Sequence, residues 1–252
     1  MAAVPRYPVM LDLSGRRCLV IGGGAVAHRK VRGLVEAGAH VTVVAPALGA
    51  ALAELLEEQA PEAVGTVTWI ERRVDSGDRG QVTDLVDSHD LTGLADLAPA
   101  RWALVVTATD DAGLNASVAT VLGEMGVWVV DASSPTGGAV STPAVHRAGP
   151  VSVAVSTSGV SPGAAGWLRD QLADALDPAV IEALELLEEV MAERRESPAA
   201  SASAYDHGEP AGRFVRVDWK RVLDSGTLDD IRHGLRARAK ERLQACLSSS
   251  SD

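Results

Sequence analysis

The sequence predicts an α/β fold whose core is a parallel sheet covered by helices on both faces. Short apolar runs, typical of buried strands, alternate with segments of helical periodicity up to residue 131. Three glycines follow the first of these apolar runs directly. Beyond residue 131 the alternation stops, and one further strand followed by amphipathic helices predicts a second, mostly helical region.

The first strand is predicted at Cys18–Ile21, and the helix after the glycines ends at Gly38. The apolar face of this helix comprises Ala27, Val31, Leu34 and Val35. Gly22-x-Gly24-x-x-Ala27 fits the dinucleotide-binding fingerprint, in which glycines allow a tight turn and a close backbone approach to a diphosphate. The stretch therefore predicts a Rossmann-type nucleotide site at Gly22, Gly23 and Gly24. The alternative is a glycine-rich turn that binds nothing.

Four more strands are predicted at His40–Val44, Val67–Ile70, Trp102–Ala108 and Val127–Val130. Helices are expected at Leu48–Glu58 and Leu114–Met125, and residues 75–99 form an irregular or partly helical stretch. Ligands of parallel sheets bind beyond the carboxyl ends of the strands. We therefore expect Pro46, Thr109, Asp110 and Asp131 to share one crevice with the glycines. No acid or arginine follows the second strand, so this position does not choose between NAD and NADP.

The second half of the chain begins with a polar loop over Ala132–Thr142 and a period-two strand over Val151–Ser156. Ser161-Pro162 starts a helix to Leu176, because Ser is a favoured N-cap and Pro a favoured first residue. Asp177-Pro178 opens the next helix. Residues 197–212 have few apolar side chains and predict a disordered linker. Val217–Leu247 is helical with a break at Ser225-Gly226, where Thr227 and Asp230 resemble a capping box.

Composition excludes several classes of function. The formal net charge of −11 argues against a nucleic-acid or anionic-membrane surface. No apolar run approaches the length of a membrane span, and the first 13 residues lack the apolar core of a signal peptide. The two cysteines and six histidines show no disulfide or metal-ligand spacing. We expect a soluble cytoplasmic protein without a fixed metal site.

Several stretches, in the same order, resemble the dehydrogenase module of siroheme synthase. They are Tyr7–Leu13, Val20–Lys30, Glu36–Pro46, Ala108–Asp111 with Leu114-Asn115, Val129–Asp131 and Val153–Pro162. The resemblance is to the precorrin-2 dehydrogenase and sirohydrochlorin ferrochelatase family and extends from about Tyr7 to Leu176. It implies a Rossmann domain over 1–141, a dimerisation region over 142–173 and a helical region over 174–252.

The family resemblance also implies chemistry. NAD accepts a hydride from precorrin-2, which gives sirohydrochlorin, and the enzyme is a homodimer. Some members then insert ferrous iron, so iron is a possible second substrate and a bifunctional enzyme is one alternative. An alternative from another class is a non-catalytic nucleotide-binding module. The polar loop after Asp131, about two residues longer than is usual in the family, favours that reading and bears on the shape of the tetrapyrrole groove.

Site residues follow from the matching motifs. Asp131 matches the family's catalytic aspartate, and a carboxylate beside a nicotinamide can take the proton that leaves with the hydride. Ala25, Val26, Pro46 and Ala47 match NAD contacts made by backbone and shape. Thr157 and Ser158 match the small polar loop beside the tetrapyrrole groove, and the alternative for both is a turn at the entry to a helix. Arg147 and Arg169 match basic positions that meet acetate or propionate groups of the tetrapyrrole. Asp110 and Asp111 are also expected to cap a helix, and His28, Arg29, Lys30 and Arg32 to form a solvated helix face.

Overall fold

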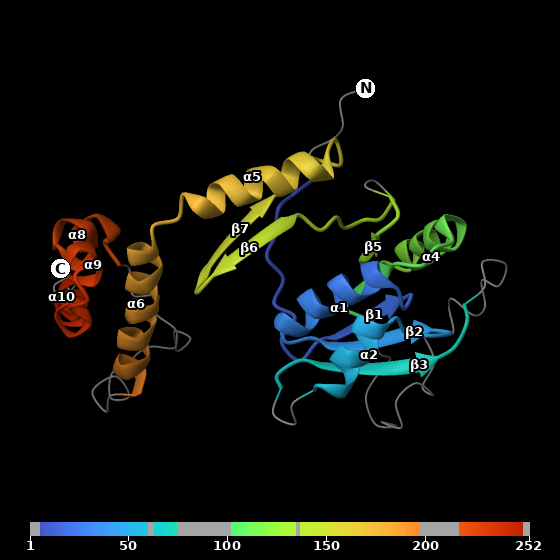
Figure 1. The fold of residues 1–252 in the computed structure, drawn as a ribbon, viewed down its shortest axis with the longest axis horizontal. Coiled ribbons are helices and arrows are strands. Elements are labelled where there is room, and N and C mark those ends of the chain that lie inside the picture. Colours follow the sequence, from blue (N-terminus) through green and yellow to red (C-terminus); the bar gives the residue numbers. More distant parts are fainter. Residues whose placement is uncertain (1–5, 60–62, 75–101, 135–136, 197–216, 249–252) are drawn as a thin grey trace, which may run out of the picture. The chain divides into compact units, whose positions relative to one another are not determined.

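The computed structural model describes residues 6–59, 63–74, 102–134, 137–196 and 217–248 (Figure 1). The chain divides into two compact units. The first comprises Met1–Thr142 with Ser158–Val160, and the second comprises Pro143–Thr157 with Ser161–Asp252. Each unit is considered by itself below.

The first unit contains a five-stranded parallel sheet. Its strands are β1 (Arg17–Ile21), β2 (His40–Ala45), β3 (Thr66–Glu71), β4 (Leu104–Thr107) and β5 (Val129–Asp131). Their order across the sheet is β3-β2-β1-β4-β5, so the winding direction reverses between β1 and β4. Such a reversal opens a crevice at the carboxyl ends of the two strands, where ligands of this fold bind. The predicted Rossmann-type fold is confirmed.

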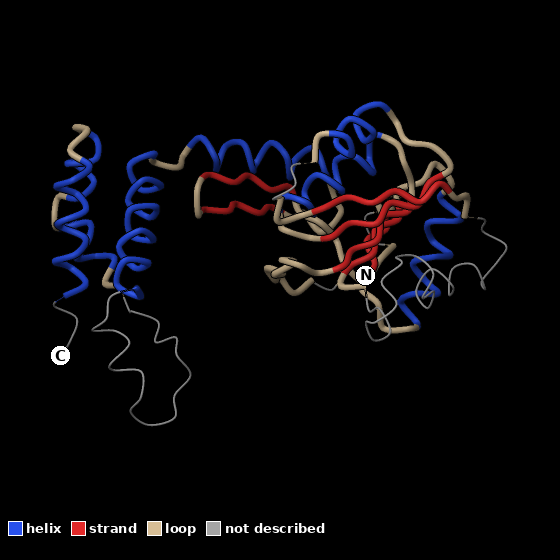
Figure 2. The backbone as a smooth tube through the Cα atoms, turned by 90° about the horizontal axis from the view of Figure 1, so that it is seen from below, coloured by secondary structure: helices blue, strands red, loops and turns tan. Residues whose placement is uncertain are grey.

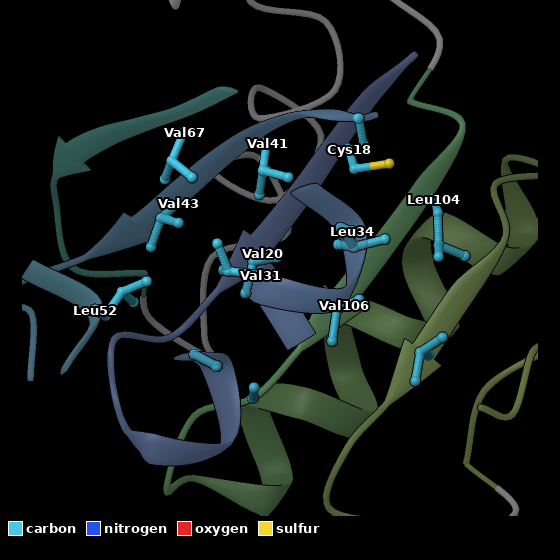
Figure 3. Packing of buried hydrophobic residues seen from close by; sticks show 14 of the residues in the cluster. Cys18, Val20, Val31, Leu34, Val41, Val43, Leu52, Val67, Leu104 and Val106 are labelled. Atoms are coloured by element: carbon cyan, nitrogen blue, oxygen red, sulfur yellow. The ribbon is translucent and has the colours of Figure 1, made fainter. Parts of the chain in front are cut away.

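Helices cover both faces of this sheet (Figure 1). Helices α1 (Ala25–Glu36) and α2 (Ala50–Glu57) pack with Val20 and Val106 on one face. Figure 3 shows part of that cluster, including Val31 from α1 between the strands and the helix. Helix α4 (Ala112–Glu124) packs with Leu19 and Val105 on the opposite face. Because both faces of β1 and β4 are buried, the sequences of these two strands are continuous apolar runs rather than alternating ones.

The second unit begins with an antiparallel hairpin, whose strands are red in Figure 2. Strands β6 (Ala144–Ala148) and β7 (Val151–Val155) pack against α5 (Pro162–Asp174). The sequence predicted β7 but not β6, because Ala-Val-His-Arg-Ala has weak strand propensity and forms a strand through its pairing with β7. Ser161 caps α5 as predicted, since its Oγ accepts a hydrogen bond from the N–H of Ala164 at 3.1 Å.

Four helices form the rest of the second unit: α6 (Pro178–Glu196), α8 (Trp219–Asp224), α9 (Thr227–Arg232) and α10 (Arg236–Ser248). Their shared core includes Ala183, Leu186, Val190, Val222 and Leu243. The predicted capping box at Thr227 and Asp230 is wrong, because Gly226 is the N-cap of α9 and no side chain caps it. Asp230 is buried, and its carboxylate pairs with Arg242 at 2.5 Å instead.

Some sequence predictions lie outside the described residues, namely the stretch 75–99 and the linker 197–212. The histidines at 89 and 207 fall in the same segments. Among the described residues, no helix combines the length and apolar character needed to span a membrane.

Candidate active site

The glycine turn after β1 joins three strand ends. Gly22 has a φ of +124°, and a Cβ there would lie 2.4 Å from the carbonyl oxygen of Ala108, directly after β4. A Cβ on Gly23 would lie 2.1 Å from the carbonyl oxygen of Ala47, which follows β2. The N–H of Gly49 donates to the carbonyl oxygen of Gly23 at 2.8 Å. Glycine is therefore required at both positions by backbone-to-backbone packing at the carboxyl ends of β1, β2 and β4.

Gly24 differs from its neighbours because no atom lies within 4 Å of the position a Cβ would take. It is the N-cap of α1, and no side chain accepts from the N–H groups of the first helical turn. Ala25 and Val26 in this turn are exposed. An uncapped helix N-terminus offers free N–H donors and a positive dipole end to an anion. The space at Gly24 therefore fits the diphosphate of a dinucleotide.

No acidic residue follows β2, and Pro46 and Ala47 lie exposed beside the glycine turn. Glu71 at the end of β3 is the register neighbour of Ala45 and is exposed. The sequence could not predict that Glu71 lies at the strand end next to that of β2, because this position depends on the order of the strands in the sheet.

The loop after β4 is held by a buried amide. Asn115 is 0% exposed, and its Oδ1 accepts from the Thr109 hydroxyl at 2.7 Å and from the Thr109 N–H at 3.2 Å. Its Nδ2 donates to the Thr109 carbonyl oxygen at 3.1 Å. Asp111 caps α4 by accepting from the N–H of Leu114 at 3.0 Å, whereas Asp110 is exposed. The sequence analysis predicted no role for Asn115. A polar residue on the otherwise apolar face of a helix does indicate a buried hydrogen-bonding group.

Asp131 ends β5 and is 5% exposed. Its Oδ1 accepts hydrogen bonds from the Ser133 N–H at 2.8 Å and the Ser133 hydroxyl at 2.6 Å. On the other side, a Cβ on Gly137 would lie 2.5 Å from Oδ2. Since β1, β4 and β5 are parallel neighbours, Asp131 lies at the same end of the sheet as the glycine turn, two strand spacings or about 10 Å away. The structure therefore brings these two predicted parts of the site together.

The four residues assigned to the tetrapyrrole lie on β6, on α5 and in the loop between β7 and α5. Thr157 Oγ1 donates to the carbonyl oxygen of Ser161 at 3.0 Å, so it holds the entry to α5. Ser158 is exposed with a φ of +52°. Arg147 is exposed on β6, and Arg169 on α5 pairs with Asp170 at 2.6 Å. Their role in substrate binding stays a prediction, as does that of Asp131.

The solvated helix face predicted on α1 is wrong for Lys30. This side chain is half-buried, and its Nζ donates to the hydroxyl of Thr142 at 2.5 Å. The sequence could not show this contact because the two residues are 112 positions apart. No group of three or more potential metal ligands is present among the residues described.

Residues 9–144 match a family model described as NAD(P)-binding. The chain belongs to this NAD(P)-binding family. The match covers the sheet, the glycine turn and Asp131, and it supports NAD as the cofactor.

Comparisons over nearly the whole of this chain agree with the resemblance found in the sequence blocks. The chain is 32% identical to the siroheme synthase of Nitrosococcus oceani over 240 residues, which are 95% of this chain and 43% of that protein. It is also 32% identical to the siroheme synthase of Gluconacetobacter diazotrophicus, covering 97% of this chain and 45% of that protein. The chain thus spans less than half the length of these relatives. The predicted relationship to siroheme synthases is confirmed.

The structure is similar to a solved structure titled "SirC, precorrin-2 dehydrogenase". The TM-score is 0.56 and the sequence identity 25%, and the alignment covers 96% of this chain and 98% of that one. This likeness extends over nearly the whole chain and therefore includes the C-terminal helices as well as the sheet.

Proposed function

We propose that this NAD(P)-binding family member oxidises precorrin-2 to sirohydrochlorin with NAD, within siroheme biosynthesis. The observation that carries the proposal is the position of Asp131, an enclosed carboxylate at the same end of the sheet as an open, glycine-lined helix N-terminus. The siroheme synthase relatives and the precorrin-2 dehydrogenase neighbour supply the substrate class.

Gly24 and the first turn of α1 would hold the diphosphate of NAD, which would supply the hydride acceptor when bound. Three hydrogen bonds join Thr109 to the side-chain amide of Asn115. They keep the backbone after β4 in one conformation beside this turn. The oxidation removes a hydride and a proton from the tetrapyrrole. Asp131 takes the proton and later releases it to solvent, and bound NAD would accept the hydride.

The hydrogen bonds of Asp131 support this role. Both bonds from Ser133 reach the same oxygen, Oδ1, and they fix the rotation of the carboxylate. Among the described residues, none donates a hydrogen bond to Oδ2. One oxygen therefore orients the group, and the other keeps its lone pairs for an incoming proton.

The test is an assay of purified protein with precorrin-2 and NAD, followed by NADH absorbance and the appearance of sirohydrochlorin. Asp131→Asn keeps the Oδ1 acceptor for Ser133 but cannot accept the proton, so turnover should fall at least about 100-fold. Glu54→Gln, on the exposed side of α2, is the control and should retain activity. Full activity of Asp131→Asn would remove the carboxylate from the mechanism. NAD binding without any turnover in the wild type would favour the non-catalytic module.

A second candidate activity is insertion of ferrous iron into sirohydrochlorin, favoured by the name of the siroheme synthase relatives. Metal insertion must remove protons from pyrrole nitrogens, and we assign that step to Asp131 as well. Sirohydrochlorin and ferrous iron without NAD should then give siroheme faster with the wild type than with Asp131→Asn. Equal rates in the presence and absence of protein would leave the dehydrogenase as the one activity.

We also propose a homodimer formed through the 142–173 region. Helix α5 exposes Trp167, Leu168 and Leu172, at 62%, 38% and 49% of their surface. Exposed apolar side chains gathered on one helix favour burial against a second copy of the chain. Trp167→Glu should shift the protein from dimer to monomer in size-exclusion chromatography with light scattering. An unchanged mass would place the interface elsewhere.

A further inference from the structure

The segment Gly137–Thr142 is fastened along the outer edge of β5. The N–H of Val140 donates to the carbonyl oxygen of Val129 at 3.1 Å. The guanidinium of Arg6 donates to the carbonyl oxygens of Ala139 and Gly138 at 3.0 and 3.1 Å. Three hydrogen bonds from two separate parts of the chain thus hold one short stretch of backbone.

Lys30 supplies a further attachment at the end of this segment. Its Nζ donates to Thr142 Oγ1 at 2.5 Å. Burial lowers the pKa of Lys30, and the nearby charge of Arg29 lowers it further. In the described part of the chain, no carboxylate lies within ion-pair distance of the Lys30 ammonium. The contact with Thr142 is therefore not an ion pair. Burying a charged amine against a neutral hydroxyl has an unfavourable desolvation energy, which the fold must offset elsewhere.

The fastened segment encloses the carboxylate of Asp131. Gly137 begins the segment, and a Cβ there would lie 2.5 Å from Asp131 Oδ2. Gly138 packs onto β5 itself, since a Cβ there would lie 2.2 Å from the carbonyl oxygen of Val129. Movement of this backbone would therefore change what surrounds Oδ2, the oxygen to which the proposed mechanism assigns the proton.

We propose that Lys30 is a positioning residue, which acts through Thr142 to hold the segment Gly137–Thr142 against the carboxylate of Asp131. This inference rests on the proposed oxidation of precorrin-2. Helix α1 starts at the glycine turn and also contains Lys30. One helix therefore carries both the proposed diphosphate site and the attachment of the segment Gly137–Thr142. Lys30 thereby links the two halves of the site.

The experiment compares Lys30→Met with Thr142→Val, which keeps the side-chain volume and removes the hydroxyl. Arg29→Met is the matched control, because it removes a neighbouring exposed cation from the same helix. Hydrogen exchange of the peptide covering 137–142 reports the attachment, since the Val140 N–H is bonded to β5. Steady-state kinetics with NAD and precorrin-2 report the positioning.

Both variants should speed exchange of the 137–142 peptide and lower kcat about tenfold, with the KM for NAD within twofold of the wild type. The double variant should have the same kcat and exchange rate as either single variant, because each single variant already removes the same hydrogen bond between Lys30 and Thr142. Lys30→Arg should restore part of kcat. The Arg29→Met control should match the wild type in every measurement.

Unchanged exchange in Thr142→Val would overturn the attachment. Faster exchange with unchanged kcat would show a purely structural contact and overturn the positioning role. If Lys30→Met fails to fold, Thr142→Val answers both questions alone. A wild type that binds NAD without oxidising precorrin-2 overturns the proposed function itself, and the exchange data then separate that failure from failure of the attachment.

Discussion

Thr107 and Asp131 are register neighbours at the carboxyl ends of β4 and β5. Their side chains leave the sheet on the same face as Val105 and Val129, which α4 covers. Thr107 is fully buried, and its hydroxyl has no hydrogen-bond partner among the residues that the structure describes. A buried, unpaired hydroxyl therefore lies next to the proposed base.

Replacing Thr107 by Val should stabilise the protein, because a methyl group takes the place of an unsatisfied hydroxyl without a change of shape. The free energy of unfolding should rise by about 1 kcal/mol, measured by urea denaturation. Thr107→Ser is the control, since it keeps the hydroxyl and loses the methyl group, and it should be less stable than the wild type. A loss of stability in Thr107→Val would show that the hydroxyl has a partner in solution.

Gly24→Ala tests the diphosphate cradle without disturbing the fold. The backbone of Gly24 has a φ of −85°, and a Cβ there meets no protein atom within 4 Å. The free energy of unfolding should fall by less than about 1 kcal/mol, as for an unfavourable N-cap. The dissociation constant for NAD, measured by calorimetry, should rise at least about tenfold, because the methyl group occupies the approach of the diphosphate.

Gly33→Ala is the control for that variant, since a Cβ also meets no atom at this position inside α1. It should stabilise the protein by about 0.5–1 kcal/mol through helix propensity and leave the NAD affinity unchanged. Equal NAD affinity in Gly24→Ala and Gly33→Ala would contradict a diphosphate at the glycine turn.

Cys18 should make stability depend on pH in the alkaline range. Burial raises the pKa of its thiol from 9.0 to about 11, and the side chain is 0% exposed. A group whose pKa is raised by folding stabilises the folded state below its unfolded pKa, and this stability is lost as pH rises through the folded value. Between pH 9 and 11 the wild type should therefore lose about 2 kcal/mol more than Cys18→Ala.

Urea denaturation of both proteins at each pH provides that measurement, and the comparison cancels the titration of other groups. Parallel pH profiles for the wild type and Cys18→Ala would show that the thiol ionises as readily in the folded protein as in the unfolded chain.

The ion pair of Asp230 and Arg242 should stabilise the helices of the second unit. Arg242 Nε lies 2.5 Å from Asp230 Oδ2, and its Nη1 donates to the carbonyl oxygen of Ser225. Arg242→Met should cost about 2 kcal/mol, because it leaves a buried carboxylate with Arg238 at 3.5 Å as its remaining described partner. Lys240→Met removes more exposed pairs with Glu189 and Glu193 and should cost less than about 1 kcal/mol. Thermal unfolding followed by circular dichroism ranks the two, and equal losses would contradict the difference in burial.

Much of the first unit could be predicted because its elements are locally encoded. Apolar runs predict β1 and β4. Between β1 and α1, the positive φ of Gly22 is a local backbone conformation that favours glycine. The expectation that Asp131 and the glycine turn share one end of the sheet followed from a general property of parallel sheets and is met. The strand β6 was missed because its residues have little intrinsic preference for extended structure.

The sequence by itself determined the elements of the sheet, the glycine turn and the carboxylate at the end of β5, because periodicity and turn chemistry act over a few residues. Tertiary structure alone decided how that carboxylate is enclosed. The contact of Lys30 with Thr142 and the bonds from Arg6 to Gly138 and Ala139 depend on the path of the chain. Residues more than 100 positions apart meet through that path, which local side-chain pattern does not encode.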